Sequence, residues 1–427
     1  MNQYAEMIRN LKTPEAMERL IRLYGNRDGM LVAQTARYTR MLKKHEELFN
    51  VQDKPVYLVS APGRTEIGGN HTDHNSGKVL AASVNLDTLA AVSARNDMQV
   101  VVHSEGYSPI TVDLSDLSAR KEEEGTTASL IRGVAARMKE LGFEIGGFEA
   151  AVTSSVGSGS GLSSSAAFEV LISAIFDKIY NGWKVDYKTQ AMISQYAENV
   201  YFGKPSGLLD QMASATGGLV FIDFKHQEAK VKPVAYDFAQ KGYSLVVVNT
   251  GGSHAGLTDH YAAIPAEMRQ VAACFGEEKL RQVRPEHFFQ EIGNIRPKVS
   301  DRALMRAIHY FTENMRVDRE VEAIEKDDME AFKKEIIASG RSSFMYLQNV
   351  FADPGQQQLS LALSIAEYLL SDKGAWRVHG GGFAGTTLNF VPNEMLPAFI
   401  EKMDSVFGQR VCQVLDIRPE GAACLDL

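Results

Sequence analysis

The amino-acid sequence predicts a mixed α+β fold that is divided into two domains. Strand-like segments and segments with the apolar spacing of helices follow each other along most of the chain. The 427 residues also exceed the roughly 250–300 residues at which a single hydrophobic core stops growing. No internal repeat and no low-complexity linker marks the division, so we place it near residue 245, where an apolar strand begins.

The N-terminal part of the chain predicts helices that are followed by strands. Residues 1–50 are rich in Leu, Met, Lys, Arg and Glu with helical apolar spacing, and Thr13 before Pro14 is typical of a helix start. After this segment we expect strands at 56–59, 79–94, 100–102 and 149–153, and a helix at 126–141.

The second half of the chain predicts more helix than strand. A buried helix over 166–180 and a strand over 244–249 precede a mostly helical stretch up to residue 370, which a Gly-rich strand pair at 376–391 follows. We therefore expect a helical extension (1–50), an N-terminal domain (51–245) and a C-terminal domain (246–427).

The composition indicates a soluble globular protein with a small-molecule partner. Hydrophobic residues make up 44% of the chain and charged residues 23%. The net charge of −8 argues against broad binding to nucleic acid, which requires a basic surface. The oligomeric state stays open, with a monomer as one possibility.

The cysteines and the hydropathy indicate a cytoplasmic location. The three cysteines, Cys274, Cys412 and Cys424, form no C-x-x-C pair, which is typical of a reduced compartment rather than of a disulfide scaffold or zinc site. The first twenty residues carry acidic side chains and lack the apolar region of a secretory signal. No run approaches the roughly 18 apolar residues of a membrane helix.

A loop rich in Gly and Ser lies between the strand at 149–153 and the helix at 166–180. Its sequence is Val156-Gly-Ser-Gly-Ser-Gly-Leu-Ser-Ser-Ser-Ala166. Glycines let backbone N–H groups approach an anion, and a helix start adds partial positive charge. Because structured segments flank the loop, we prefer a phosphate-binding loop to a flexible linker. The chain has no G-x-x-x-x-G-K-[ST] motif, so this is not the usual P-loop.

A second loop, over residues 61–74, gathers polar side chains where a strand ends. Its sequence is Ala61-Pro-Gly-Arg-Thr-Glu-Ile-Gly-Gly-Asn-His-Thr-Asp-His74. Asp accepts and His donates hydrogen bonds in fixed directions, which suits a hydroxyl-rich ligand such as a sugar. Two alternatives stay open, namely a turn capped by Asp73 and Asn75 and a metal site at His71, Asp73 and His74.

A third Gly-rich segment, His379–Gly385, contains G-x-G-x-x-G at Gly380, Gly382 and Gly385. The dinucleotide-binding fingerprint needs a helix after this motif, whereas Thr386–Val391 predicts a strand. A Rossmann dehydrogenase is therefore the weaker alternative, and a tight turn that packs near a ligand is the better interpretation.

Together these segments resemble the GHMP kinase superfamily and, within it, the galactokinases. The order P-G-R…H-T-D, G-L-S-S-S-A and G-G-G-F-x-G matches the family, and Gly207-Leu-Leu-Asp-Gln211 resembles its G-I-M-D-Q segment. The resemblance covers residues 55–427. It implies a two-domain GHMP kinase fold, with the active site between an N-terminal mixed-sheet domain and a C-terminal α+β domain. It also implies ATP and Mg²⁺ as cofactors.

The resemblance further implies a role for each matching residue. Asp210 would be the catalytic base and Arg64 its cationic partner, while Ser165 and Glu198 would bind Mg²⁺. The triphosphate would be wrapped by Gly157, Ser158, Gly159, Ser160, Gly161, Leu162, Ser163 and Ser164. The sugar would be contacted by Asn70, His71, Asp73, Gly207 and Tyr261. The floor of the site would be closed by Gly380, Gly381 and Gly382.

The chain departs from the galactokinase pattern in the loop over residues 61–74, which we call the sugar loop. Galactokinases usually read G-E-H-T-D-Y, where this chain has Asn70 for the Glu and His74 for the Tyr, and Glu66 stands where Asn is common. An amide at position 70 would not repel a carboxylate on the sugar. Plant-type galacturonate kinases look similar at these positions, so galacturonate is the alternative substrate. Galactose stays the predicted substrate for phosphorylation at the anomeric hydroxyl, because the rest of the chain resembles ordinary galactokinases and this loop has no extra Arg.

Two further classes of function stay open at this point. Some galactokinase relatives are sensors that bind sugar and ATP without turnover, although the residues matching the base and the metal ligands are present here. Mevalonate or homoserine phosphorylation is another chemistry of the superfamily, but the H-T-D segment and G-L-S-S-S-A favour a sugar.

Overall fold

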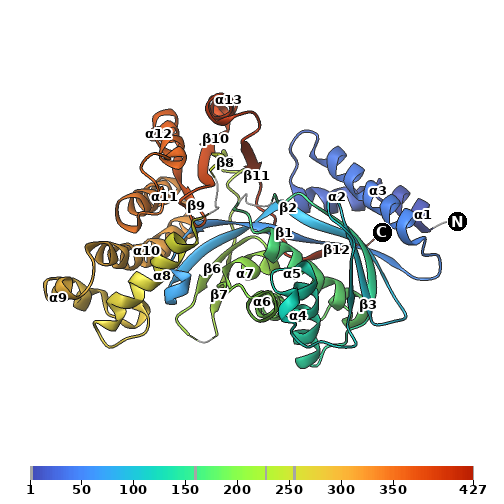
Figure 1. Ribbon diagram of the computed structural model, residues 1–427. Coiled ribbons are helices and arrows are strands. Elements are labelled where there is room, and N and C mark those ends of the chain that lie inside the picture. The colour runs from blue at the N-terminus through green and yellow to red at the C-terminus, as the bar shows by residue number, and fades with distance from the viewer. Residues whose placement is uncertain (1–2, 158–160, 227, 253–255, 427) are drawn as a thin grey trace.

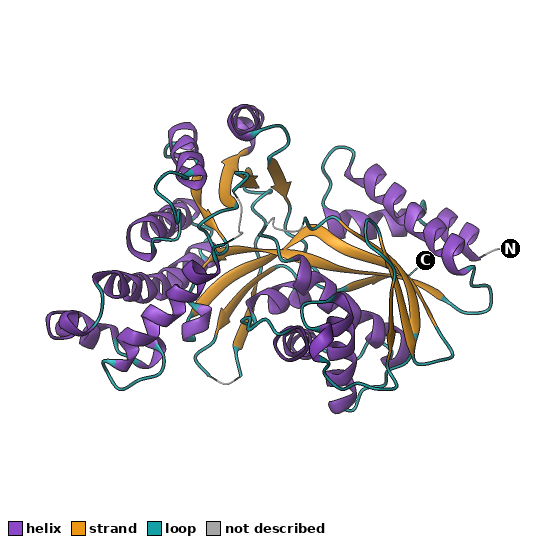
Figure 2. Ribbon diagram, viewed as in Figure 1, coloured by secondary structure: helices purple, strands orange, loops and turns teal. Residues whose placement is uncertain are grey.

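The structure is a computed structural model that describes residues 3–157, 161–226, 228–252 and 256–426. Two β-sheets form its framework, and helices cover their faces (Figures 1 and 2). Within these described ranges, no helix is both long enough and apolar enough to cross a membrane.

Among the described residues, the larger sheet has eight strands. Six follow the order β12-β1-β2-β5-β3-β4, and β6 and β7 continue from β2. β2 has two partners along its length, because residues 88–94 pair with β5 and residues 78–82 pair with β6. The strands are β1 (Val56–Gly68), β2 (Lys78–Ala94), β3 (Gln99–Ser104), β4 (Ile110–Asp113), β5 (Phe148–Ser154), β6 (Leu219–Asp223), β7 (Lys230–Val234) and β12 (Ala423–Leu425).

Helices cover both faces of this sheet because both faces are apolar. Side chains alternate along a strand, so Leu58 and Leu89 pack under one group of helices, while Val59 and Val92 pack under the other. The first group is α1 (Gln3–Asn10), α2 (Pro14–Tyr24) and α3 (Met30–Phe49). The second group is α4 (Thr127–Glu140), α5 (Ser164–Phe176), α6 (Tyr187–Tyr196) and α7 (Leu209–Thr216). Figure 1 shows the two groups above and below the long β1–β2 pair.

The second sheet has four antiparallel strands in the described segments. Their order is β11 (Cys412–Leu415), β8 (Tyr243–Asn249), β10 (Thr386–Pro392) and β9 (Ala375–His379). Val246 and Val248 of β8 pack under α12 (Gln358–Leu370) and α13 (Leu396–Phe407). The remaining helices of this half are α8 (Thr258–Ala273), α9 (Pro285–Ile295), α10 (Asp301–Glu325) and α11 (Met329–Ser342).

A shared hydrophobic core joins the two sheets. Leu245 and Val247 of β8 share one cluster with Leu80 and Ala82 of β2 and with residues of α10 and α11. The chain ends in the first sheet, where β12 pairs with β1. The first strand of the second sheet, β8, contains residue 245, near which we predict the division between the domains. The last strand of the chain, β12, nevertheless belongs to the first sheet.

Most of the expected elements are present, and one prediction about β1 is wrong. The helices within 1–50, the helix at 126–141 and the strand pair after residue 374 are confirmed. The strand that we expected to end at residue 59 continues to Gly68. A register shift between Pro62 and Arg64 explains the difference, because such a bulge accommodates a proline that has no N–H to donate.

Candidate active site

Arg64 and Asp210 face each other at the centre of the candidate site. The Arg64 guanidinium donates through Nε to Asp210 Oδ1 at 2.7 Å, and the Ser163 hydroxyl donates to Asp210 Oδ2 at 2.7 Å. Burial alone would raise the pKa of Asp210, but the charge of Arg64 and both hydrogen bonds outweigh it and hold the pKa below its usual value. The carboxylate is therefore ionised at neutral pH, and its side chain remains 30% exposed to a ligand.

Arg64 reaches Asp210 because β1 passes close to the Gly/Ser loop. The Arg64 backbone N–H donates to the Leu162 carbonyl at 2.9 Å, and a Cβ atom on Gly63 would lie 2.7 Å from that carbonyl oxygen. Glycine is therefore required at this close approach. The register of β1 is unbroken from Arg64 to Glu66, so these two side chains project from the same face of the strand.

The Gly/Ser loop ends at the N-terminus of α5. Its predicted phosphate-binding residues Ser158, Gly159 and Ser160 lie outside the described residues. Ser163 has a left-handed backbone conformation, with φ of 60°, and it turns the chain into α5, whose first residue is Ser164. Backbone N–H groups at a helix start, together with the helix dipole, favour a bound anion. The described part of the loop therefore suits a phosphate group.

Glu198 is the centre of a second polar group beside this helix start. Its carboxylate, in a residue only 2% exposed, accepts hydrogen bonds from the Ser165 hydroxyl at 3.2 Å and from the Gln211 amide at 2.8 Å. The Lys204 ammonium lies 2.6 Å from Glu198 Oε1, and the Ser206 hydroxyl donates to Oε2. Four side chains from three segments of the chain thus fix one buried carboxylate next to α5.

Sequence reasoning missed Glu169, which lies behind this group. Gln211 donates to Glu169 Oε2 at 3.0 Å as well as to Glu198, so one amide links the two acids. Burial raises the pKa of Glu169 well above its usual range, and the charge of Glu198 raises it further. The signal that could have revealed Glu169 is its spacing, because it lies four residues after Ser165 on the same face of α5.

Asp73 and Gly207 lie directly opposite each other on the other side of the site. A Cβ atom on Gly207 would lie 2.4 Å from Asp73 Oδ2, so a side chain there would displace the carboxylate. Burial, with the nearby charge of Glu66 adding to it, raises the pKa of Asp73 to about 6. Asp73 can therefore accept charge-assisted hydrogen bonds through both oxygens at neutral pH, whereas in mild acid one oxygen becomes a donor and the charge is lost.

The glycine turn over residues 380–382 accepts hydrogen bonds through its three carbonyl groups. The donors are three side chains that we expected at the sugar, namely Asn70 at 2.7 Å, His71 at 2.9 Å and Tyr261 at 2.8 Å. The turn leads into β10 rather than into a helix, which excludes the dinucleotide fingerprint. The glycine turn thus holds the sugar loop in place.

Asn70, which we predict to contact the sugar, has no exposed surface in this structure. Its amide nitrogen donates to Glu66 at 2.9 Å and to the glycine turn. Its amide oxygen accepts from Asn349 at 2.9 Å and from Ser343 at 3.3 Å. An amide side chain has two N–H donors and two lone pairs, and all four are in use. Asn70 therefore joins the sugar loop to the C-terminal half of the chain.

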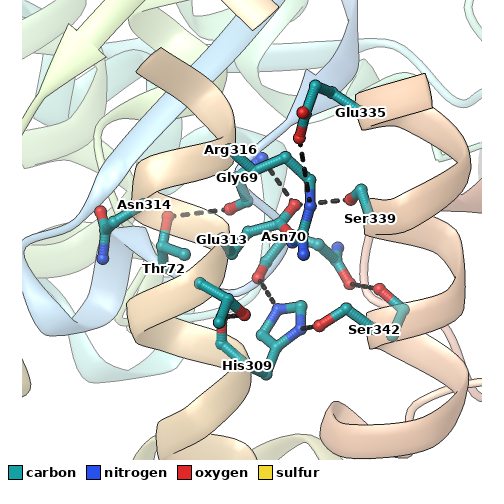
Figure 3. Close-up of polar contacts among 12 residues, drawn as sticks. Gly69, Asn70, Thr72, His309, Glu313, Asn314, Arg316, Glu335, Ser339 and Ser342 are labelled. Atoms are coloured by element: carbon teal, nitrogen blue, oxygen red, sulfur yellow. Dashed lines mark hydrogen bonds and ion pairs between the residues drawn. The ribbon is translucent and has the colours of Figure 1, made fainter. Parts of the chain in front are cut away.

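Helix α10 contacts the sugar loop and the start of β2 through polar side chains, as Figure 3 shows. His309 Nε2 lies 2.9 Å from the Asn70 carbonyl oxygen, and the Glu313 carboxylate accepts from the Gly69 N–H at 3.2 Å. Asn314, the residue after Glu313, accepts through Oδ1 from the Lys78 N–H at 2.7 Å, at the start of β2. These contacts join residues more than 230 positions apart in the sequence, and no local sequence motif predicts them.

Helix α11 supports these α10 side chains in turn (Figure 3). Ser342 pairs with His309 Nδ1 at 2.8 Å, and Ser339 donates to the Glu313 carboxylate. Arg316 pairs with the other oxygen of Glu313. Burial lowers the pKa of His309 to about 4, so the imidazole is neutral above that pH and can donate to one partner and accept from the other.

The structure brings most predicted site residues into one region. Arg64, Asp210, Ser163, Ser165 and Glu198 form one side, which suits phosphate transfer, and Asp73, Gly207, His71 and Tyr261 lie on the side of the sugar loop. The alternative metal site at His71, Asp73 and His74 is not supported, because no cluster of three or more His, Cys, Asp or Glu side chains suited to a metal occurs in the described ranges.

Comparison with known proteins decides the family. The galactokinase galactose-binding signature matches residues 43–94, and the model of the GHMP kinases N terminal domain matches residues 129–218. A galactokinase of Streptomyces coelicolor is 30% identical over 393 residues, which cover 89% of this chain and 96% of that protein. The chain belongs to the galactokinase family.

Other galactokinases and GHMP kinases agree with this membership. A galactokinase of Glaesserella parasuis is 31% identical over 348 residues, which cover 80% of this chain and 86% of that protein. The crystal structure of Lactococcus lactis galactokinase complexed with galactose superimposes with a TM-score of 0.78, at 24% identity, over 91% of this chain and all of that one. Methanococcus jannaschii mevalonate kinase superimposes with a TM-score of 0.61 at 12% identity, over 84% and 98% of the two chains.

Membership of the galactokinase family confirms the predicted GHMP kinase fold and makes the protein a sugar kinase with ATP as its phosphate donor. The signature over 43–94 contains Arg64, Asn70 and Asp73, so the departures at the sugar loop lie inside a segment that still matches the family.

Proposed function

We propose that this galactokinase-family protein transfers the γ-phosphate of ATP to the anomeric hydroxyl of galactose and so forms galactose 1-phosphate. The observation that carries the proposal is the ionised Asp210 carboxylate, which Arg64 and Ser163 hold beside the start of α5. The relatives from Streptomyces coelicolor and Glaesserella parasuis are galactokinases, and the Lactococcus lactis structure was solved with galactose.

The transfer chemistry follows from the charges around Asp210. Phosphoryl transfer has a loose transition state and demands mainly positioning and charge neutralisation. Asp210 Oδ2 orients the anomeric hydroxyl and accepts its proton as the hydroxyl oxygen bonds to the γ-phosphorus, while the bond from that phosphorus to the bridging oxygen breaks and ADP leaves. A carboxylate with a lowered pKa is a weak base, so we expect the proton to move late in the step. The Arg64 guanidinium offsets the negative charge that develops beside it.

The oxygen atoms of Ser165 and Glu198 fit a magnesium ion. The two oxygens lie 3.2 Å apart, and both are of the hard type that Mg²⁺ prefers. Mg²⁺ usually takes one or two carboxylates from the protein, and phosphates and waters complete its shell. That pattern agrees with the lack of a larger ligand cluster in the described residues. When bound, the ion would supply positive charge to the phosphates.

The charges on the sugar side favour a neutral sugar over a uronic acid. Glu66, Asp73 and Asp210 all contribute carboxylates to this region, and Glu66 adds to the raised pKa of Asp73. Two arginines of this region are paired with these acids, Arg64 with Asp210 and Arg377 with Glu66 at 2.7 Å. Arg377 also has no exposed surface. A carboxylate on the ligand would add a negative charge beside three acids, of which the two paired arginines offset only two, so galactose is preferred over galacturonate.

We further propose that the protein works in the cytoplasm with ATP and a sugar as its partners. The three cysteines are unpaired in the described structure, which agrees with a reducing compartment. Residues 51–245 and 246–427 remain the two domains that we propose, and residues 1–50 remain a helical extension.

The test is ADP release from Mg-ATP with galactose, galacturonic acid, N-acetylgalactosamine and glucose, measured side by side. We expect galactose to give the highest kcat/KM and galacturonic acid a value at least about tenfold lower, since one unmatched charge contact costs more than the roughly 1.4 kcal/mol that a factor of ten requires. A higher rate with galacturonic acid would overturn the argument from the three carboxylates. Sugar binding without ADP release would overturn the proposed activity itself.

A further inference from the structure

Lys204 is a cation on the side of the site that suits phosphate transfer, and the sequence predicts no role for it. It follows the π-helical turn Ala197–Phe202, and Gly203 has a left-handed conformation with φ of 84° that ends this turn. The Lys204 backbone N–H donates to the Glu198 carbonyl at 3.1 Å, and its Nζ lies 2.6 Å from Glu198 Oε1. Two contacts, one through the backbone and one through the side chain, therefore fix this lysine relative to Glu198.

The ammonium group lies at the boundary between the protein and the solvent. The side chain of Glu198 is 2% exposed, whereas that of Lys204 is 56% exposed. An ammonium group has three donors, and in the described part of the chain Glu198 is its one hydrogen-bond acceptor. The group is thus anchored on a buried acid and keeps donors for a ligand.

Lys204 lies beside the groups that handle phosphate. Glu198 Oε1, which contacts the ammonium, also accepts from Ser165 in the first turn of α5. Two residues earlier in the chain, Ser163 contacts Asp210. The positive charge of Lys204 helps to lower the pKa of Asp210, which agrees with its closeness to the reacting groups.

The charge balance of this region creates a need for another cation. Asp210 and Glu198 carry negative charge here, and the Arg64 guanidinium is already paired with Asp210. A triphosphate adds several negative charges beside these acids. The Lys204 ammonium has donors beyond its contact with Glu198, and a compact ammonium on a flexible stem is a common phosphate ligand.

We infer that Lys204 contacts the terminal phosphate of the bound nucleoside triphosphate and is a further catalytic residue of the transfer reaction. This inference rests on the proposed function, because it needs a nucleotide at the start of α5. It assigns to Lys204 the stabilisation of the phosphoryl group in transfer, in addition to its pairing with Glu198.

The experiment measures nucleotide binding rather than turnover. Lys204→Met, Lys204→Arg and wild type are titrated by calorimetry with Mg-ADP and with a Mg-bound non-hydrolysable ATP analogue. The control is Lys241→Met, which also removes a lysine from an acid pair, 2.6 Å from Asp327, but far from the site. A circular dichroism melt of each variant confirms that it is folded.

We expect Lys204→Met to weaken binding of the ATP analogue about tenfold or more, because a hydrogen bond to a charged group contributes roughly the free energy of a tenfold change in affinity or more. The affinity for ADP, which lacks the terminal phosphate, should stay within about twofold of wild type. Lys204→Arg should restore most of the loss, and Lys241→Met should change neither affinity. Equal losses for both nucleotides, or no loss for the analogue, would overturn the contact with the terminal phosphate. Failure of the wild type to bind either nucleotide would overturn the proposed function together with this inference.

Discussion

The two sides of the active site are built in different ways. The side for phosphate transfer combines short segments between residues 63 and 211, and its main charges, on Arg64 and Asp210, are paired but still accessible. The side for the sugar is a loop of the N-terminal half that α10, α11 and the glycine turn of the C-terminal half hold in place. Most of the side chains that make these contacts with the sugar loop are buried.

This difference separates chemistry from positioning. A substitution on the transfer side should change the rate of the reaction and leave the fold intact, because the charged groups there keep contact with solvent or ligand. A substitution among the contacts that α10, α11 and the glycine turn make with the sugar loop should mainly lower the stability of the fold. It leaves a buried charge or hydrogen-bonding group without its partner. The predictions below test this separation, beginning with the largest expected effect.

Asp210→Asn should lower kcat about 10²–10⁴-fold, since a positioned base contributes about that factor. The amide keeps the shape of the side chain, its oxygen still accepts from Arg64, and its NH2 group can donate to the Ser163 hydroxyl, so galactose and ATP should bind nearly as in wild type. Steady-state ADP release gives kcat, and calorimetry gives both affinities. A kcat near that of wild type would remove Asp210 from the role of base.

Glu313→Gln should destabilise the fold by about 3 kcal/mol, because it removes one partner of a buried ion pair. Arg316 is 7% exposed and would lose its close counter-charge, and the Gly69 N–H would lose a charged acceptor. Urea unfolding measures the loss. The matched control is Glu367→Gln, whose pair with Arg341 at 3.2 Å is exposed on both sides and should contribute about 1 kcal/mol or less. Equal effects of the two substitutions would contradict the separation drawn above.

The sequence allowed the transfer side to be predicted in more detail than the sugar side. The Gly/Ser loop, Arg64, Glu198 and Asp210 lie in short motifs whose chemistry can be read from neighbouring residues, and their side chains do converge in the structure. The positions of Ser163 and Asp210 relative to Arg64 follow from the close packing of β1 against the loop.

The role of Asn70 could not be predicted for a physical reason. Its four hydrogen bonds involve partners at positions 66, 343, 349 and 380, and three of these come from the other half of the chain. A residue type at one position of a motif specifies what it can bond, but the long-range fold determines which partners lie within reach. The same reason explains why His309 and Glu313 carried no signal in the sequence.

Galactose binding should weaken as the pH falls below about 6, because the pKa of Asp73 is raised to about 6. Above this pH the carboxylate accepts charge-assisted hydrogen bonds from the sugar, and below it the protonated form loses the charge and one acceptor oxygen. The KM for galactose should rise towards a limit of tenfold per pH unit between pH 6 and 5, whereas the affinity for ATP should change less. A KM that stays constant between pH 5 and 8 would contradict a sugar contact by Asp73.

Glu320→Gln should make the protein more stable at alkaline pH, by about 1–2 kcal/mol at pH 9. Both carboxylate oxygens of Glu320 are buried and without a hydrogen-bond partner in the described structure, behind Gly68 at the end of β1. Burial, with the charge of Glu313 adding to it, raises the pKa of Glu320 to about 8. The folded state therefore keeps a proton that the unfolded chain releases above about pH 4.5, so stability falls between pH 4.5 and 8 and stays low above that range.

Urea unfolding of wild type and Glu320→Gln at pH 5, 7 and 9 measures this difference, which should grow with pH. Glu322→Gln is the matched control, because Glu322 lies on the same helix with its side chain 60% exposed and paired with Lys326. A difference that is the same at all three pH values would mean that Glu320 is ionised in the folded protein. A growing difference, with kcat unchanged at pH 7, would show that the network behind the sugar loop affects stability separately from the phosphate-transfer chemistry.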